Sequence, residues 1–133
     1  MEEIAVYRVY IETHFAAAHQ LHGYKGLCRD LHGHTWKVRV GISTDRINDI
    51  GISFDFKDLK EITNKVLESL DHHYINDVPP FDKENPTAEN LSRYIHDEIK
   101  KRIPKHVRMT DVTVWESDSY SVSYSENPSA EDQ

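Results

Sequence analysis

At 133 residues, the chain has room for one compact domain but not for two ordinary ones. Its formal net charge of -7 argues against a nucleic-acid partner, which usually needs a basic patch, and no run of about 18 apolar residues marks a membrane span. The single cysteine excludes an internal disulfide, and the acidic start lacks the basic segment of a signal peptide, so we expect a cytoplasmic protein.

The first part of the chain is expected to contain two strands. Residues 4–13 are rich in Val, Ile and Tyr, which predicts the first strand. A loop is expected over residues 20–31, where glycines and charges gather. Residues 34–43 alternate between apolar and polar side chains, which predicts a second strand. Its apolar face consists of Trp36, Val38, Val40 and Ile42.

The middle of the chain changes to a helical period. Apolar residues recur every three or four positions after Asp55, the expected N-cap: Leu59, Ile62, Val66 and Leu70. Thr87 is expected to cap a second helix. Two further strands are expected over residues 109–116 and 119–124, and residues 126–133 are expected to form a disordered tail.

The resulting order is strand, strand, helix, helix, strand, strand. It predicts a single α+β domain over residues 1–125, in which two helices cover one face of a four-stranded antiparallel sheet. Such a sheet has two open edges, and pairing these edges between subunits into a barrel would protect both. We therefore expect an oligomer.

Histidines near the start of the chain form the first candidate site. His32 and His34 are two positions apart, so they share one face of the second strand, and His19 at the end of the first can add a third nitrogen. Three imidazoles leave a tetrahedral zinc ion with one open position. Two alternatives remain: polar surface histidines, or a closed structural zinc site in which Cys28 is the fourth ligand.

Cys28 and the pair Asp71-His72 form the second candidate site. Cys28 lies in a polar loop next to Arg29, where cations and zinc would lower the pKa of the thiol and suit it to act as a base or nucleophile. Asp71 and His72 offer an orienting and proton-relaying pair. A histidine that interacts with the helix dipole is the alternative for His72.

Glu116 and Thr87 are candidate ligand contacts. Glu116 lies in the strand segment VTVWES, and its carboxylate suits a ligand edge with two adjacent N–H donors. An exposed glutamate at a strand end is the alternative. Thr87 is an N-cap first and a ligand contact second.

Several segments together resemble the 6-pyruvoyl- and 6-carboxytetrahydropterin synthase superfamily. They occur in the family's order: FAAAHQL (15–21), CRDLHGHTWKV (28–38), FDFKDLK (54–60), LDHHYIND (70–77), NPTAEN (85–90) and VWES (114–117). The resemblance extends from about residue 4 to residue 125. It implies the tunnelling fold (ββααββ), in which trimeric barrels stack as a homohexamer. The implied site consists of zinc ligands His19, His32 and His34, proton-transfer residues Cys28, Asp71 and His72, and pterin contacts Glu116 and Thr87. Asp71 and His72 would come from the neighbouring subunit.

The spacing Cys-x-x-x-His-Gly-His resembles that of the bacterial 6-carboxytetrahydropterin synthases of queuosine biosynthesis. The resemblance implies a zinc-dependent lyase that converts 7,8-dihydroneopterin triphosphate to 6-carboxy-5,6,7,8-tetrahydropterin, with release of acetaldehyde and triphosphate. The alternatives are a 6-pyruvoyl-tetrahydropterin synthase and a non-catalytic zinc- or pterin-binding protein. Two features depart from this pattern. Many relatives place Thr-Pro after the glutamate, where this chain has Ser117-Asp118, and a negative chain is unfavourable for a triphosphate unless Lys25 and Arg29 compensate locally.

Overall fold

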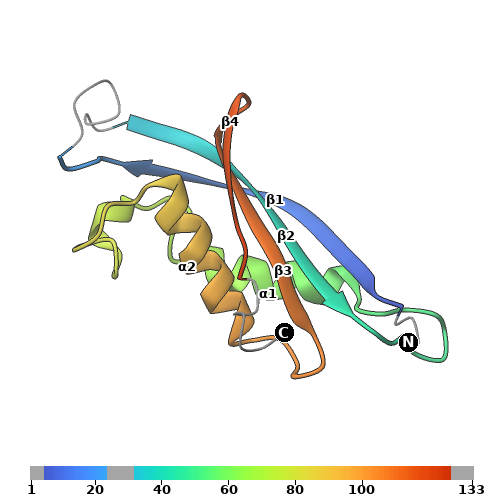
Figure 1. The fold of residues 1–133 in the computed structure, drawn as a ribbon. Helices are drawn as coiled ribbons and strands as arrows, with labels where there is room; N and C mark the ends of the chain where they lie inside the picture. Colours follow the sequence, from blue (N-terminus) through green and yellow to red (C-terminus); the bar gives the residue numbers. More distant parts are fainter. Residues whose placement is uncertain (1–4, 24–31, 127–133) are drawn as a thin grey trace.

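The computed structural model describes residues 5–23 and 32–126. In chain order, the elements are strands β1 (Tyr7–His19) and β2 (His32–Thr44), helix α1 (Phe56–Leu67), the short 3-10 helix η2 (Ile75–Asp77), helix α2 (Ala88–Lys100), and strands β3 (Arg108–Ser117) and β4 (Tyr120–Tyr124). Figure 1 shows this arrangement. The predicted order of strands and helices is confirmed. The expected tail lies outside the described residues, apart from Glu126.

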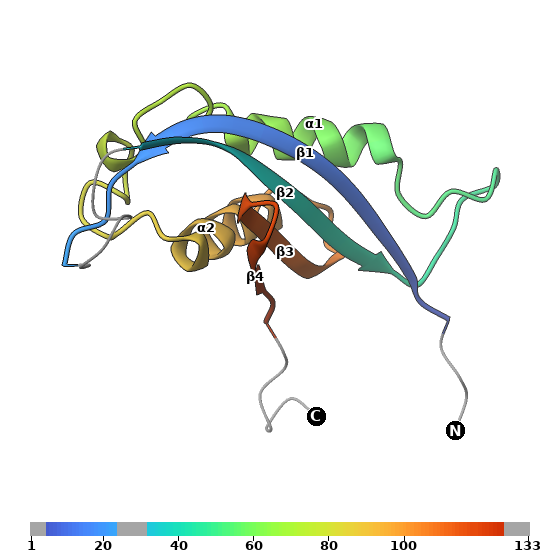
Figure 2. The ribbon, with the colours of Figure 1, turned by 90° about the horizontal axis from the view of Figure 1, so that it is seen from above.

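The four strands form one antiparallel sheet in the order β1-β2-β3-β4. β1 and β2 pair along their whole length, from Tyr7 opposite Thr44 to His19 opposite His32, and both are long and curved (Figure 2). The first strand was predicted to end at residue 13, which is wrong. β1 continues to His19 because the alanines at its end pair with β2 on one side. On the other side, Ala16 and Ala18 form backbone hydrogen bonds with His72 and His73.

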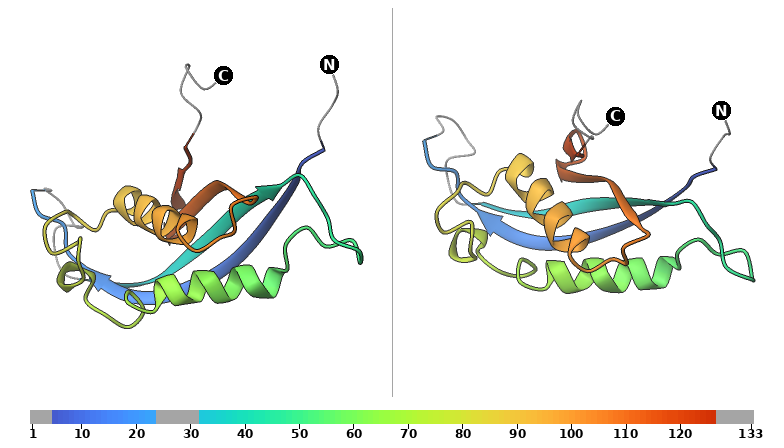
Figure 3. Two further views of the ribbon diagram at one scale, coloured as in Figure 1. Left: turned by 90° about the horizontal axis from the view of Figure 1, so that it is seen from below. Right: turned by 60° about the horizontal axis from the view of Figure 1, so that its bottom comes forward.

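Helices α1 and α2 lie next to one another and cover the apolar face of the sheet, α1 near β1 and α2 near β3 and β4 (Figure 3). Both helices begin where the sequence predicts. Asp55 accepts a hydrogen bond from the Lys57 amide at 2.8 Å, and Thr87 Oγ1 accepts one from the Asn90 amide at 3.1 Å. Each cap satisfies a backbone N–H that has no partner within the helix. None of the described helices is long and apolar enough to cross a membrane.

The core lies between the helices and alternate residues of the strands. The predicted apolar face of β2 is confirmed, because Trp36, Val38, Val40 and Ile42 are fully buried. Trp36 stacks in parallel on Phe15 of β1, with ring centroids 5.9 Å apart. The indole therefore closes the end of the core at which the two strands carry their histidines, and it packs against the rings of His19 and His34.

The opposite face of the sheet is polar. Arg39 reaches Asp111 on β3 at 3.3 Å and lies over the ring of Tyr10 on β1. Gly41 makes this close arrangement possible, because a Cβ atom there would lie 2.6 Å from Tyr10 Cε1 and 2.7 Å from Asp111 Oδ1. At this position the glycine serves close approach rather than an unusual backbone angle.

Candidate functional site

His19 and His34 lie together where β1 and β2 leave the core. The register sets Ala17 opposite His34, so the two histidines come from neighbouring positions on the paired strands. Their ring centroids are 5.1 Å apart, and each ring meets Trp36 edge-on, at 4.9 Å for His19 and 5.3 Å for His34. The His19 side chain is fully buried, and that of His34 is 20% exposed. The pair thus has one protected and one accessible member.

Glu116 of β3 completes this group. Its Oε1 atom lies 3.4 Å from His19 Nε2 and 3.3 Å from His34 Nε2. One ligand atom from each of the three residues lies within 4.8 Å of the other two. Alternation along β3 explains this position, because Glu116 follows Val112 and Val114 on the core face. The sequence therefore placed Glu116 in a site, but did not show that it adjoins two imidazoles.

The loop before α2 fixes the orientation of the His19 ring. His19 Nδ1 lies 2.9 Å from the carbonyl oxygen of Pro86, in a buried contact. A carbonyl only accepts hydrogen bonds, so Nδ1 carries the proton and donates it. In the neutral ring, this tautomer leaves the Nε2 lone pair directed at His34 and Glu116. A second hydrogen bond of this kind is typical of metal-ligating histidines.

The donor atoms in this group suit a divalent cation of the zinc type. Imidazole nitrogen and carboxylate oxygen are both ordinary zinc ligands. In the neutral ring, a proton on Nδ1 leaves Nε2 as the ligating atom, which is the form that a metal ion binds. The predicted third histidine, His32, lies at the start of β2 opposite His19, which is consistent with a shared site, but its side chain lies outside the described residues. Cys28, Lys25 and Arg29 also lie outside them.

Asp71 and His72 are in contact with one another, as the sequence predicts for an orienting pair. His72 Nδ1 lies 3.0 Å from Asp71 Oδ1, and the same oxygen accepts a hydrogen bond from the Ala16 amide at 2.9 Å. The Ala16 hydrogen bond lowers the pKa of Asp71 below its ordinary value of 3.8; burial opposes this effect, and His72 adds to it. Asp71 therefore stays ionised and tied to β1.

His72 has an unusual backbone and an exposed ring. Its φ angle is +60°, which is uncommon for a residue with a side chain. Its side chain is 82% exposed, whereas His19 is fully buried. The alternative that His72 serves only the helix dipole does not account for its bond to Asp71. Within one chain, His72 faces solvent.

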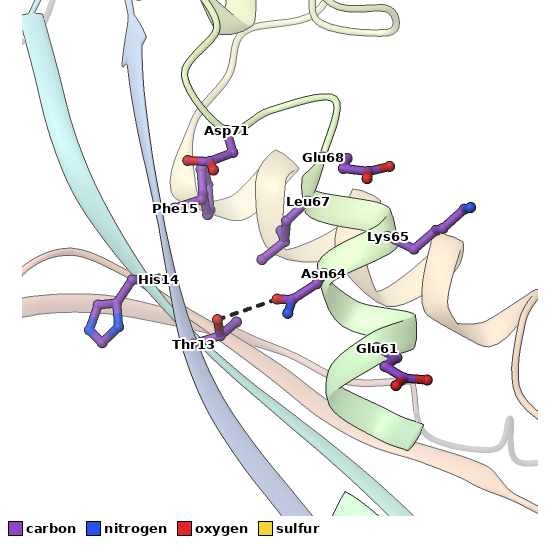
Figure 4. Close-up of a pocket in the computed structure, with 9 residues that line it drawn as sticks. All are labelled: Thr13, His14, Phe15, Glu61, Asn64, Lys65, Leu67, Glu68 and Asp71. Atoms are coloured by element: carbon purple, nitrogen blue, oxygen red, sulfur yellow. Dashed lines mark hydrogen bonds between the residues drawn. The ribbon is translucent and has the colours of Figure 1, made fainter. Parts of the chain in front are cut away.

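Asp71 also lies at the rim of a groove between β1 and α1. Figure 4 shows this groove, where Asp71 lies close to Phe15 and Thr13 Oγ1 meets Asn64 Oδ1 at 3.5 Å. The cavity has a volume of about 520 Å³. His14, by contrast, projects from β1 away from α1 in this view. Asp71 is the one predicted site residue among those that line the groove.

Two asparagines hold the segment that follows His19. Asn76 accepts a hydrogen bond from the Gln20 amide at 2.9 Å and donates one to the Gln20 carbonyl at 2.8 Å. Asn85 does the same for His22, at 2.9 and 2.7 Å. Each side-chain amide therefore pairs with the backbone as a neighbouring strand would. Sequence reasoning missed both roles, although both residues lie in segments that carry the resemblance.

The stretch Asn85-Pro86-Thr87 thus supports the site in three ways. Asn85 holds the backbone at His22, the Pro86 carbonyl fixes His19, and Thr87 starts α2. For Thr87, the structure confirms the capping role. Its predicted contact with a ligand stays a prediction.

Comparisons with known proteins identify the family of the chain. The family model described as 6-pyruvoyl tetrahydropterin synthase matches residues 8–127. A Synechocystis sp. protein named 6-carboxy-5,6,7,8-tetrahydropterin synthase is 36% identical over 98 residues, which cover 70% of this chain and 74% of that protein. A Pyrococcus furiosus protein named dihydroneopterin monophosphate aldolase is 31% identical over 93 residues, which cover 70% and 76%.

A solved structure shares the fold. The 6-pyruvoyl tetrahydropterin synthase of Caenorhabditis elegans superposes with a TM-score of 0.83 at 25% identity, covering 96% of this chain and all of that one. The sheet, the two helices and their order are therefore those of a known enzyme fold.

Proposed function

Because the chain belongs to the 6-pyruvoyl tetrahydropterin synthase family, we propose that it converts 7,8-dihydroneopterin triphosphate to 6-carboxy-5,6,7,8-tetrahydropterin. Membership of this family makes the chain a lyase that acts on a pterin. The observation that carries the proposal is the group His19, His34 and Glu116, which combines metal ligands with a carboxylate able to receive the pterin edge. The name of the Synechocystis relative favours the carboxy product.

We assign the zinc ion to His19, His32 and His34. When bound there, zinc would polarise a side-chain oxygen of the substrate and raise the acidity of its protons. The chain's own residues then provide orientation. The Pro86 carbonyl holds His19 in the tautomer that ligation needs, and Trp36 supports both described rings from below.

Proton transfer is assigned to Cys28, Asp71 and His72. Asp71 accepts from His72 Nδ1 and keeps the opposite ring nitrogen, Nε2, directed outward as the proton-moving atom. Because His72 is exposed in the single chain, we propose that it serves the site of a neighbouring copy in a homohexamer. Cys28 would take and return protons at the side-chain carbons of the substrate.

Glu116 and Thr87 are assigned to the pterin ring. A carboxylate pairs well with two adjacent N–H donors, and Glu116 is half-buried, which strengthens such a pair. The reaction consumes one water molecule, whose oxygen enters the new carboxylate, and releases acetaldehyde and triphosphate, while the side-chain carbons together give up the two electrons that reduce the ring. No external oxidant or reductant is needed. The product would serve queuosine biosynthesis.

Product analysis tests the proposal. Zinc-loaded protein is incubated with 7,8-dihydroneopterin triphosphate, and the pterin product and acetaldehyde are measured by mass spectrometry. Equal amounts of 6-carboxytetrahydropterin and acetaldehyde are expected. A pyruvoyl product without acetaldehyde would instead establish the second candidate, a 6-pyruvoyl-tetrahydropterin synthase, which is the activity in the name of the C. elegans enzyme.

Two further arms separate the remaining readings. Turnover of the monophosphate in preference to the triphosphate would match the activity in the name of the P. furiosus relative and overturn our choice of substrate. Cys28→Ala should abolish turnover and keep zinc, whereas Cys28→Ser tests whether the thiol itself is needed. Wild-type protein that binds pterin but turns over neither phosphate would support a non-catalytic binding protein.

A further inference from the structure

We propose that Glu116 is itself a ligand of the metal ion in the resting protein, beside His19 and His34. This role differs from contact with the pterin ring, and it gives one carboxylate two uses. The inference rests on the proposed metal site but not on the proposed reaction. It concerns the protein before substrate arrives.

The distances between the three side chains carry the proposal. Zinc bonds of about 2.0–2.2 Å in a tetrahedron separate neighbouring ligand atoms by roughly 3.3–3.6 Å. Glu116 Oε1 lies 3.4 Å from His19 Nε2 and 3.3 Å from His34 Nε2, within this range. A charge-assisted hydrogen bond between imidazolium and carboxylate would be shorter, at about 2.7–2.9 Å. The carboxylate oxygen thus lies at the separation from both nitrogens that ligands of one tetrahedral ion have.

The strand that carries Glu116 has a bulge in its pairing at this position. The pairing of β3 with β4 shifts between Trp115 and Ser117, so that Glu116 lies in the irregularity. Such a bulge commonly turns a side chain toward a site at the edge of a sheet. Glu116 continues the core face beyond Val114 by alternation, and at the bulge it meets the two histidines at the end of the sheet.

A second group of metal-binding side chains in the described part of the chain provides a comparison. His96, Asp97 and Glu126 also have ligand atoms within 4.8 Å of one another. There, His96 Nδ1 is 3.0 Å from Asp97, and Glu126 contacts Lys100 at 3.1 Å and the Tyr124 hydroxyl at 2.8 Å. Those distances are hydrogen-bonding distances, and an ammonium group at the carboxylate opposes a cation. This group is a polar network and not a metal site.

Metal binding by matched carboxylate variants tests the inference. Wild type, Glu116→Gln and Glu126→Gln are stripped of metal, and the affinity for Zn²⁺ is measured by competition with a chelator, without substrate. Loss of an outer partner alone costs about 10–100-fold in affinity, so loss of a direct ligand in Glu116→Gln should cost at least about 100-fold. Glu126→Gln should stay within about threefold of wild type.

The visible spectrum of the Co²⁺ protein separates direct ligation from an indirect effect. A change of ligand alters the cobalt bands, so Glu116→Gln should change the spectrum and Glu126→Gln should not. Glu116→Asp, which keeps the carboxylate on a shorter stem, provides a second variant, and circular dichroism checks that each protein folds. The Glu116→Asp protein should bind Zn²⁺ more tightly than the Glu116→Gln protein.

Three results would overturn the inference. The first is a Zn²⁺ affinity of Glu116→Gln within threefold of wild type. The second is weaker binding with an unchanged cobalt spectrum, which would make Glu116 an outer partner only. The third is an equal loss in Glu126→Gln. Because no assay here uses turnover, failure of the proposed reaction would leave the result intact, and failure of this test would leave the reaction open.

Discussion

The Asn85 side chain offers the sharpest link between the support of the site and its activity. Replacing it by alanine removes both hydrogen bonds to the His22 backbone. Each such bond contributes about 0.5–1.5 kcal/mol, and since these are exposed, we expect a combined cost of about 1–2 kcal/mol. That cost should fall on local opening of the segment after β1, because the core is untouched.

Hydrogen exchange and steady-state kinetics measure the two consequences. A loss of 1–2 kcal/mol should speed exchange of the His22 amide about 5–30-fold. Turnover should fall as well, because the segment between His19 and His32 carries Cys28, and a less fixed starting point misplaces it. The loss should appear in kcat more than in KM.

Asn48 provides a matched control for this variant. It also uses its side chain to hold two backbone amides, those of Ile50 and Ile52, but it does so in the connection between β2 and α1. Asn48→Ala should therefore show similar local loosening with unchanged turnover. If Asn48→Ala lowers kcat as much as Asn85→Ala, general destabilisation explains both. If Asn85→Ala exchanges faster but keeps full activity, the reasoning is refuted.

Three further outcomes are expected. Gly41→Ala should destabilise the protein by about 1–3 kcal/mol in urea unfolding, because the added Cβ would meet two side chains. Gly33→Ala on the same strand has no neighbour within 4 Å among the described residues, so it should cost less than about 0.5 kcal/mol. Equal losses in the two variants would contradict the packing argument. The Ala16 amide holds the pKa of Asp71 below 3.8, so the ionised carboxylate stabilises the folded protein, by under about 1 kcal/mol for so exposed a group. This stabilisation is present above pH 4 and is lost as the pH falls through the folded pKa. The melting temperatures of wild type and Asp71→Asn should therefore converge in acid, and parallel curves would exclude this role. Thr87→Ala should cost about 1 kcal/mol of unfolding free energy and Thr87→Ser almost none, and an equal loss in both would argue against the cap.

Local patterns predicted most of the fold. The alternation from Trp36 to Ile42 identified the buried face of β2, and the caps at Asp55 and Thr87 gave the starts of both helices. These signals depend on neighbours within a few residues, so one sequence contains them. The end of β1 was missed because alanine favours strands weakly, and its pairing there is set by distant segments.

The site was only partly predictable for a related reason. Histidine spacing indicated a metal site, but the contact of Glu116 with His19 and His34 depends on the register of three strands and on a bulge. The pairing of Asn85 with His22 joins residues 63 positions apart. Such contacts depend on which distant segments the fold brings together, and no local pattern in the sequence records that.

The short segment after α1 has a consequence for assembly. The His72 amide donates to the Ala16 carbonyl, and the Ala18 amide donates to the His73 carbonyl, so the segment occupies the outer edge of β1 at its far end. By alternation, the outward backbone groups that remain on β1 belong to Arg8, Tyr10, Glu12 and His14. A strand from a second copy could therefore pair only as far as His14 before it met this stop. The chain itself would then fix the stagger between the paired strands of two copies. Stagger and strand number together determine the width of a barrel, so the few residues beside the proposed proton relay would help to determine the size of the barrel.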